Sequence, residues 1–189
     1  GPSQTRFLTT IQIAAIPDPG PFAEWTPEAR AALTGAQIQA LNVGRVRLTL
    51  LTPQQIAWLT IPQIQSLQLA DFKFLTANQT PFLTTGQIAS IPDPGPFVEW
   101  RASARAALTS VQIQALNVRD VRLGLLTPQQ IAWLSVAQIQ SLQMPDFKFL
   151  GAAQTPSLTV AQIRLIPDPG PFSEWSPEAR GALTSAQIQ

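Results

Sequence analysis

The sequence of 189 residues contains no cysteine, histidine or tyrosine, and only one methionine. Cysteine and histidine are the usual ligands of zinc and haem, and histidine is the usual base of hydrolytic triads. Their absence excludes these common sites, and no disulfide can form. We therefore expect a protein that is not an enzyme and has no cofactor, no metal site and no catalytic residue.

Charge and long apolar segments are scarce as well. The chain has 12 basic and 11 acidic residues, scattered singly, which leaves a net charge of +1. Proteins that bind nucleic acid through its phosphates usually carry a basic patch, and a membrane-spanning helix needs about 20 mostly apolar residues in a row. Neither feature is present, so we expect no nucleic-acid partner and no membrane insertion.

The sequence repeats itself. The segment Ile-Pro-Asp-Pro-Gly-Pro-Phe begins at Ile16, Ile91 and Ile166, so its copies are evenly spaced along the chain. Such a regular period is typical of stacked repeat proteins and predicts one continuous solenoid. Its predicted parts are a processing scar and lead-in at 1–6, a first repeat at 7–81, a second repeat at 82–156 and a partial third repeat at 157–189. Three coils make up the first repeat, at 8–32, 33–58 and 59–82.

The phrase Leu-Thr-x-x-Gln-Ile occurs ten times, once with Ser135 in place of Thr. A Thr that caps a helix accepts a hydrogen bond from the third helical residue, and a Gln at that residue bonds back to the amide of the cap. The flanking Leu and Ile form a hydrophobic staple. Each phrase therefore predicts the start of a short helix. The predicted pairs are Thr9 and Gln12, Thr34 and Gln37, Thr52 and Gln55, Thr60 and Gln63, Thr84 and Gln87, Thr109 and Gln112, Thr127 and Gln130, Ser135 and Gln138, and Thr159 and Gln162.

The connections between these helices show a different pattern. Apolar and polar residues alternate over 46–50 and over 72–74, and a period of two is typical of a strand. The fold predicted from both patterns is an α/β repeat solenoid, with coils of short capped helices plus one short strand. The alternative is an all-β solenoid in which Thr and Gln side chains form hydrogen-bonded ladders.

Carboxylates recur in the Pro-rich segment of each repeat, as Asp18 with Glu24, Asp93 with Glu99, and Asp168 with Glu174. Paired carboxylates serve as acid and base in glycosidases, and carboxylates with carbonyls can bind calcium. An Asp between two prolines more commonly forms a turn by bonding to its own backbone. We favour the turn.

Tryptophan and arginine also recur at fixed places. Trp25, Trp100 and Trp175 occupy one position of the repeat and form a possible binding ladder for a glycan or a peptide, whereas burial in the core is the reading we favour. Trp58 and Trp133 occupy a second position. The arginines Arg45, Arg47, Arg119 and Arg122 could meet phosphates or carboxylates, although we favour a solvated face.

The octads LTTGQIAS, LTPQQIAW and LTIPQIQS resemble the Leu-Thr-Thr-x-Gln-Ile-x-x-Leu repeats of very large bacterial surface proteins described as adhesins. The resemblance implies a protein of the cell surface or a secreted protein with an extended repeat region. We therefore expect a structural stalk, spacer or filament whose partners are neighbouring repeats, with end-to-end self-association. The alternative is a module that binds a glycan or protein ligand.

Overall fold

The computed structural model describes residues 1–16, 19–45, 47–91, 94–118, 121–166 and 170–189. They form two compact units, Gly1–Ala107 and Leu108–Gln189. Every regular element in these ranges is a helix of three to six residues. The prediction of an α/β solenoid is therefore wrong, and so is its all-β alternative.

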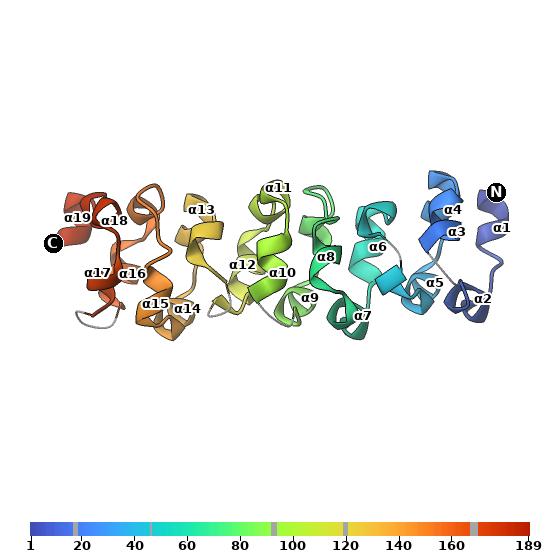
Figure 1. Ribbon diagram of the computed structural model, residues 1–189, viewed down its shortest axis with the longest axis horizontal. Coiled ribbons are helices and arrows are strands. Elements are labelled where there is room, and N and C mark those ends of the chain that lie inside the picture. The colour runs from blue at the N-terminus through green and yellow to red at the C-terminus, as the bar shows by residue number, and fades with distance from the viewer. Residues whose placement is uncertain (17–18, 46, 92–93, 119–120, 167–169) are drawn as a thin grey trace. The chain divides into compact units, whose positions relative to one another are not determined.

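The first unit contains eleven labelled α-helices and three 3₁₀-helices in its described residues (Figure 1). In chain order they are α1 (Pro2–Thr5), α2 (Thr10–Ala14), α3 (Pro19–Glu24), α4 (Pro27–Ala31), α5 (Gly35–Ala40), η1 (Val43–Arg45), η2 (Leu48–Leu50), α6 (Pro53–Trp58), α7 (Ile61–Ser66), α8 (Leu69–Phe72), η3 (Thr80–Phe82), α9 (Thr85–Ala89), α10 (Pro94–Glu99) and α11 (Ala102–Ala106). In the second unit they are α12 (Ser110–Ala115), η5 (Leu123–Leu125), α13 (Pro128–Ala132), α14 (Val136–Ser141), α15 (Met144–Phe147), η6 (Thr155–Ser157), α16 (Val160–Arg164), α17 (Gly170–Glu174), α18 (Pro177–Gly181) and α19 (Ser185–Ile188).

The helices of the first unit form three rows. The first row consists of α2, α5, α7 and α9, which follow one another along one side of this unit (Figure 1). The middle row consists of α3, η1 with η2, α8 and α10, and the third row consists of α1, α4, α6, η3 and α11. Contacts of α2 with α5, α8 with α10, and α6 with η3 join successive coils within a row. One coil therefore contributes one segment to each row.

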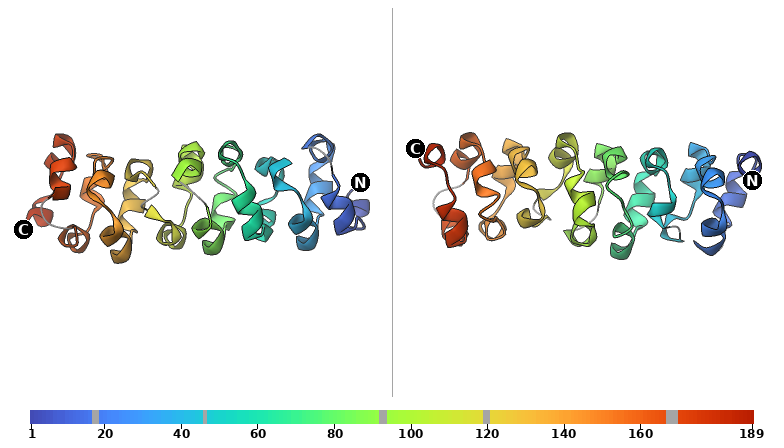
Figure 2. Two further views of the ribbon diagram at one scale, coloured as in Figure 1. Left: turned by 60° about the horizontal axis from the view of Figure 1, so that its bottom comes forward. Right: turned by 90° about the horizontal axis from the view of Figure 1, so that it is seen from above.

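The second unit is built in the same way. Its first row contains α12, α14, α16 and α19, its middle row η5, α15 and α17, and its third row α13, η6 and α18. Contacts of α16 with α19, α15 with α17, and α13 with η6 again join successive coils. Figure 2 shows each unit from two further sides as a succession of short helices. Because isolated helices this short are unstable in water, their stability must come from packing between coils.

The alternation that predicted strands has another cause. At 46–50 the amides of Leu50 and Leu51 donate to the carbonyls three residues earlier, which makes a 3₁₀ turn. Such a turn has three residues, so buried Leu48 and buried Leu51 lie on the same side. The same spacing separates buried Phe72 from buried Leu75. The true period is three, and residue 46 itself lies outside the described residues.

The core is filled by the Leu and Ile side chains of the repeated phrase. In the phrase that begins α12, for example, Ile113 has 0% of its surface exposed and Leu108 has 1%, and the same pair is buried in the phrases of α5, α6 and α14. Val111 lies on the same helix and is 60% exposed. One helix therefore offers a buried and an exposed apolar residue two positions apart.

We predict that replacing Ile113 with Ala lowers the free energy of unfolding by about 2–5 kcal/mol, because a cavity remains in the core. Val111→Ala in the same helix should change it by less than about 0.5 kcal/mol. Urea unfolding of both variants checks the prediction. Similar losses for the two variants would contradict the burial that separates them.

Candidate functional site

The recurring feature of both units is a glutamine that joins its own coil to the coils before it. Gln63 shows the arrangement: its side-chain Oε1 accepts a hydrogen bond from the amide of Thr60 at 2.9 Å. Its Nε2 donates to the carbonyl of Ile38 at 2.9 Å and to that of Leu41 at 2.8 Å, at the end of α5. One carboxamide thus caps the start of α7 and the end of α5, the corresponding helix of the preceding coil.

The same bonds recur at the equivalent position of the next repeat. Gln138 Oε1 accepts from the amide of Ser135 at 2.9 Å, and its Nε2 donates to the carbonyls of Ile113 at 2.8 Å and Leu116 at 3.0 Å. We call this arrangement a glutamine joint. Its members are Gln37, Gln55, Gln63, Gln79, Gln87, Gln130, Gln138, Gln154, Gln162 and Gln187.

The predicted caps lie where the sequence placed them. The cap amide donates to Gln Oε1 at every predicted pair. At Thr109 the hydroxyl also contacts Gln112 Oε1, at 3.1 Å. Gln12 differs from the others because its side chain is exposed, and its Nε2 bonds to no described residue.

Three joints lie outside the predicted pairs: that of Gln187, in the tenth phrase, and two that the phrase does not cover. Gln79 Nε2 donates to Leu48 and Leu51 at 2.6 and 2.7 Å, and Gln154 makes the corresponding bonds to Leu123 and Leu126. A Thr follows each of these glutamines instead of the Ile of the phrase, but Leu-Thr-x-x-Gln at 75–79 still carries the signal. In α1, which covers part of the predicted lead-in, Oε1 of Gln4 likewise accepts from the Gly1 amine.

The third-row helix of the Pro-rich coil has alanine at the glutamine position, namely Ala29 in α4 and Ala104 in α11. An arginine acts there instead. Nη1 of Arg30 donates to the carbonyls of Ala23, at 3.1 Å, and Trp25. Arg105 makes the corresponding bonds in α11, and burial lowers the pKa of its guanidinium below the usual value. These arginines cap the preceding helix of their own coil.

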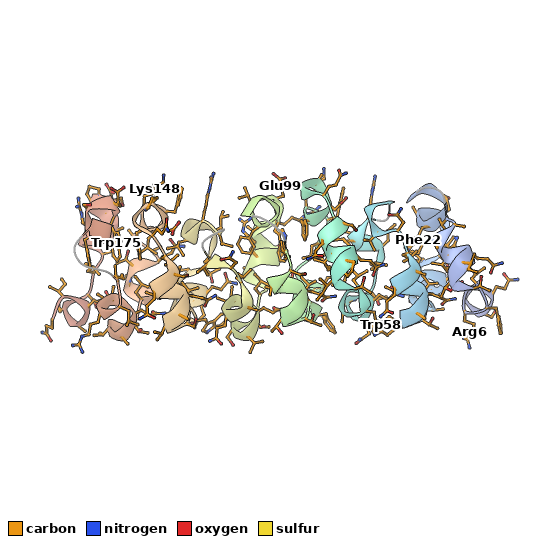
Figure 3. The ribbon with its side chains drawn as sticks, turned by 90° about the horizontal axis from the view of Figure 1, so that it is seen from below. Arg6, Phe22, Trp58, Glu99, Lys148 and Trp175 are labelled. Atoms are coloured by element: carbon orange, nitrogen blue, oxygen red, sulfur yellow. The ribbon has the colours of Figure 1, made fainter. Side chains whose placement is uncertain are left out.

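A tryptophan of the Pro-rich coil packs against the preceding coil. Trp100 is 1% exposed and its ring stacks on Phe72 of the preceding coil, with centroids 5.8 Å apart and an interplanar angle of 13°. Trp175 is equally buried and stacks on Phe147 at 6.1 Å. Trp175 is labelled in Figure 3. The buried indole Nε1 of each has no hydrogen-bond partner among the described residues. Neither ring is available to a ligand in this structure.

The third member of the possible ladder is different. Trp25 is half-buried and lines a cavity of about 390 Å³ together with Leu8 and Ala29. Trp58 and Trp133 are also half-buried, and the indole of Trp58 lies against Gly35. A row of exposed indoles at equivalent positions is therefore absent from the described part of the chain.

The carboxylate pairs are only partly described. Asp18, Asp93 and Asp168 lie outside the described residues, whereas Glu24, Glu99 and Glu174 are exposed at the ends of α3, α10 and α17. Among described residues, no three acidic side chains gather where they could hold a metal ion. The ranges that the structure describes also contain no helix with the length and apolarity to cross a membrane.

Two of the four arginines considered from the sequence are exposed. Arg47 Cζ lies 5.5 Å from the ring centroid of Phe74, and Arg122 Cζ lies 5.3 Å from that of Phe149. The side chain of Arg45 and all of Arg119 lie outside the described residues.

Comparisons of the chain with protein-family models, with curated proteins and with solved structures found no match. The function proposed below therefore depends on the glutamine joint.

We predict that Gln138→Glu destabilises the chain in a pH-dependent manner. A carboxylate cannot donate to the carbonyls of Ile113 and Leu116, whereas the protonated acid can donate to one of them, so the pKa of the new side chain is raised in the folded state above the value of about 4.3 in the unfolded chain. Stability relative to the parent chain should be highest near pH 4 and fall as pH rises through the raised pKa, with a loss of at least about 2 kcal/mol at pH 7. Urea unfolding at both pH values measures this difference.

Gln12→Glu provides the matched control, since Gln12 caps its helix without donating to another coil. Its free energy of unfolding should change by less than about 0.5 kcal/mol at either pH. Equal losses for the two variants would show that the cap, and not the bond between coils, carries the energy.

We also predict that Trp100→Ala lowers the free energy of unfolding by about 3–5 kcal/mol, because a large buried side chain is lost. Trp25→Ala should cost less than half of that, since Trp25 is only half-buried and no Phe of a preceding coil stacks on it. Urea unfolding compares the two variants. A larger loss for Trp25→Ala would contradict the assignment of Trp100 to the joint.

Proposed function

We propose that this chain is a non-catalytic structural repeat segment, a stalk or spacer in which length is set by the number of coils. The observation that carries the proposal is the glutamine joint, which recurs at equivalent positions of the repeat in both units. Each joint uses groups that every coil provides, namely one carboxamide and two carbonyls. Another coil can therefore be added by the same bonds, and stability accumulates from nearest-neighbour interfaces.

The parent protein is proposed from the sequence. The octads resemble those of large bacterial surface proteins, and a spacer fits such a protein because it carries another module away from the cell. We therefore propose that the chain belongs to the cell surface or is secreted. Its proposed partners are neighbouring repeats.

End-to-end self-association is part of the same proposal. Phe7 and Ile11 in the first repeat are about four-fifths exposed, and Ile188 in α19 is 71% exposed. At equivalent positions of inner coils the corresponding side chains are less exposed, namely Phe82 at 44%, Val111 at 60% and Ile113 at 0%. Exposed apolar surface of this kind favours association with another copy.

We predict that the radius of gyration of chains carrying two, four and six copies of the repeat rises in proportion to copy number. A chain of this length that folded into one globule would have a radius of gyration of about 16 Å, and this value would grow only as about the 0.38 power of length. Small-angle X-ray scattering distinguishes growth in proportion to copy number from the slower growth of a globule. Growth as slow as that of a globule would refute the spacer.

A further inference from the structure

The tryptophan of the Pro-rich coil has an aromatic partner in two of its three copies. Trp100 stacks on Phe72 and Trp175 stacks on Phe147, in each case on the middle-row segment of the preceding coil. These two phenylalanines are buried as deeply as the indoles that cover them. Trp25 holds the same place in the first copy, and no ring of a preceding coil stacks on it in the described part of the chain.

Trp25 is nevertheless held by its own coil as Trp100 is. The ring centroids of Phe22 and Trp25 lie 5.5 Å apart with an interplanar angle of 39°, and those of Phe97 and Trp100 lie 5.6 Å apart with an angle of 38°. The indole is therefore already oriented before any partner arrives. Such preorganisation reduces the entropy cost of binding.

The space beside Trp25 is a cavity of about 390 Å³. Thr26 and Ala29 line it on the side of the Pro-rich coil, and Gln4 and Thr5 of α1 line it on the other side. Helices α1 and α4 lie side by side at this end of the first unit (Figure 1). The volume falls within the range of about 300–1,000 Å³ that is typical of ligand pockets.

The next repeat shows what fills this place. The counterparts of Trp25 and Thr26 there are Trp100 and Arg101. Trp100 stacks on Phe72, and Nε of Arg101 donates to the carbonyl of Lys73 at 3.0 Å. The cavity beside Trp25 therefore corresponds to the place that the end of α8, with Phe72, occupies in the next repeat.

A second side chain of the first coil also lacks the partner that its counterpart has. Gln87, the counterpart of Gln12, donates from Nε2 to the carbonyls of Ile56 at 3.0 Å and Leu59 at 2.7 Å. The side chain of Gln12 is exposed, and its Nε2 bonds to no described residue. Trp25 and Gln12 are thus both in position for contacts that the following repeat makes with the coils before it.

We propose that the cavity beside Trp25 binds the middle-row segment of a third coil from another chain of this repeat, with the phenylalanine equivalent to Phe72 stacked on Trp25. In the first repeat this segment reads Gln-Leu-Ala-Asp-Phe-Lys-Phe-Leu, at 68–75. The inference rests on the self-association proposed above and names its contact. Because the cavity and the segment are different surfaces, the association is head to tail and extends into a filament unless it closes into a ring.

This occupant is favoured by its continuity with an interface that the structure contains twice, at Trp100 and at Trp175. Apolar contact between chain ends would fix no register, whereas the stacked ring fits only where a third coil meets a Pro-rich coil. Phe72 and Phe147 are covered within the folded chain, at 2% and 1% exposure. A donor chain therefore presents the segment only where a third coil is its last.

A peptide with the sequence of residues 68–75 and blocked ends tests the proposal on the whole chain. The five tryptophans are replaced by 5-fluorotryptophan, and the variant Trp25→Phe assigns the resonance of Trp25 in fluorine NMR. We expect the peptide to shift this resonance with a Kd on the order of 1 mM, because one phenylalanine is buried and one aromatic pair forms. Trp100 and Trp175 already carry their phenylalanines, so their resonances should not move.

Two variant peptides identify the ring that binds. Phe72→Ala in the peptide should abolish the shift, because the stacked ring is lost. Phe74→Ala should leave the Kd within about threefold, since Phe74 does not stack on the tryptophan and side chains outside the centre of an interface contribute little. Neither change alters the protein, so a loss of binding cannot come from misfolding.

Three outcomes would overturn the proposal. One is a resonance of Trp25 that does not move when the peptide is present at about ten times the expected Kd. Another is equal binding of the Phe72→Ala peptide, which would show that the cavity accepts any apolar peptide. The third is movement of Trp100 or Trp175 instead, which would assign the peptide to exchange at existing contacts. Growth of the radius of gyration with copy number tests the spacer separately and would stand in each case.

Discussion

The structure depends on one property of the carboxamide group, which offers an acceptor and two donors on a single planar end. Helices of four to six residues leave most of their end groups without intrahelical partners. The glutamine joint satisfies three of these groups at once. Oε1 of Gln63 accepts from the amide at the start of its own helix, and Nε2 donates to two carbonyls of the preceding coil. Without the joint, each coil would bury carbonyls that nothing satisfies.

This requirement explains why the sequence uses glutamine and not glutamate. A capping box accepts either residue, because only an oxygen is needed at the third helical position. Contact with the preceding coil needs a donor as well, and an ionised carboxyl has none. The glutamines are also neutral, so all of them except half-buried Gln63 can be buried at 1–8% exposure without an ionic partner.

The helix starts could be predicted from the sequence because the capping box is local: Thr60 and Gln63 are three residues apart. The bonds from Gln63 to the preceding coil could not be predicted. Their acceptors are the main-chain carbonyls of Ile38 and Leu41, and every residue type has such a carbonyl. The prediction of strands was wrong for a related reason. Leu48 and Leu51 are three residues apart and bury one side of a turn, but an intervening half-buried Leu50 gives the appearance of a period of two. The sequence marks the Pro-rich coil as unusual. The stacking of Trp100 on Phe72 could not be predicted, because it joins residues that are far apart in the sequence.

The joints of one repeat are of two kinds. Those made by glutamine are directional, since a hydrogen bond weakens steeply when donor and acceptor move out of line. In the Pro-rich coil the third-row glutamine is replaced by alanine, and this coil is joined through the middle row instead, by stacked rings whose indole nitrogen bonds to nothing in the described chain. Stacked aromatic rings keep most of their attraction when they slide over one another. A chain of such repeats would be stiff against shear at five joints in six and yield at the sixth, so bending under load would concentrate at a hinge placed once in every repeat.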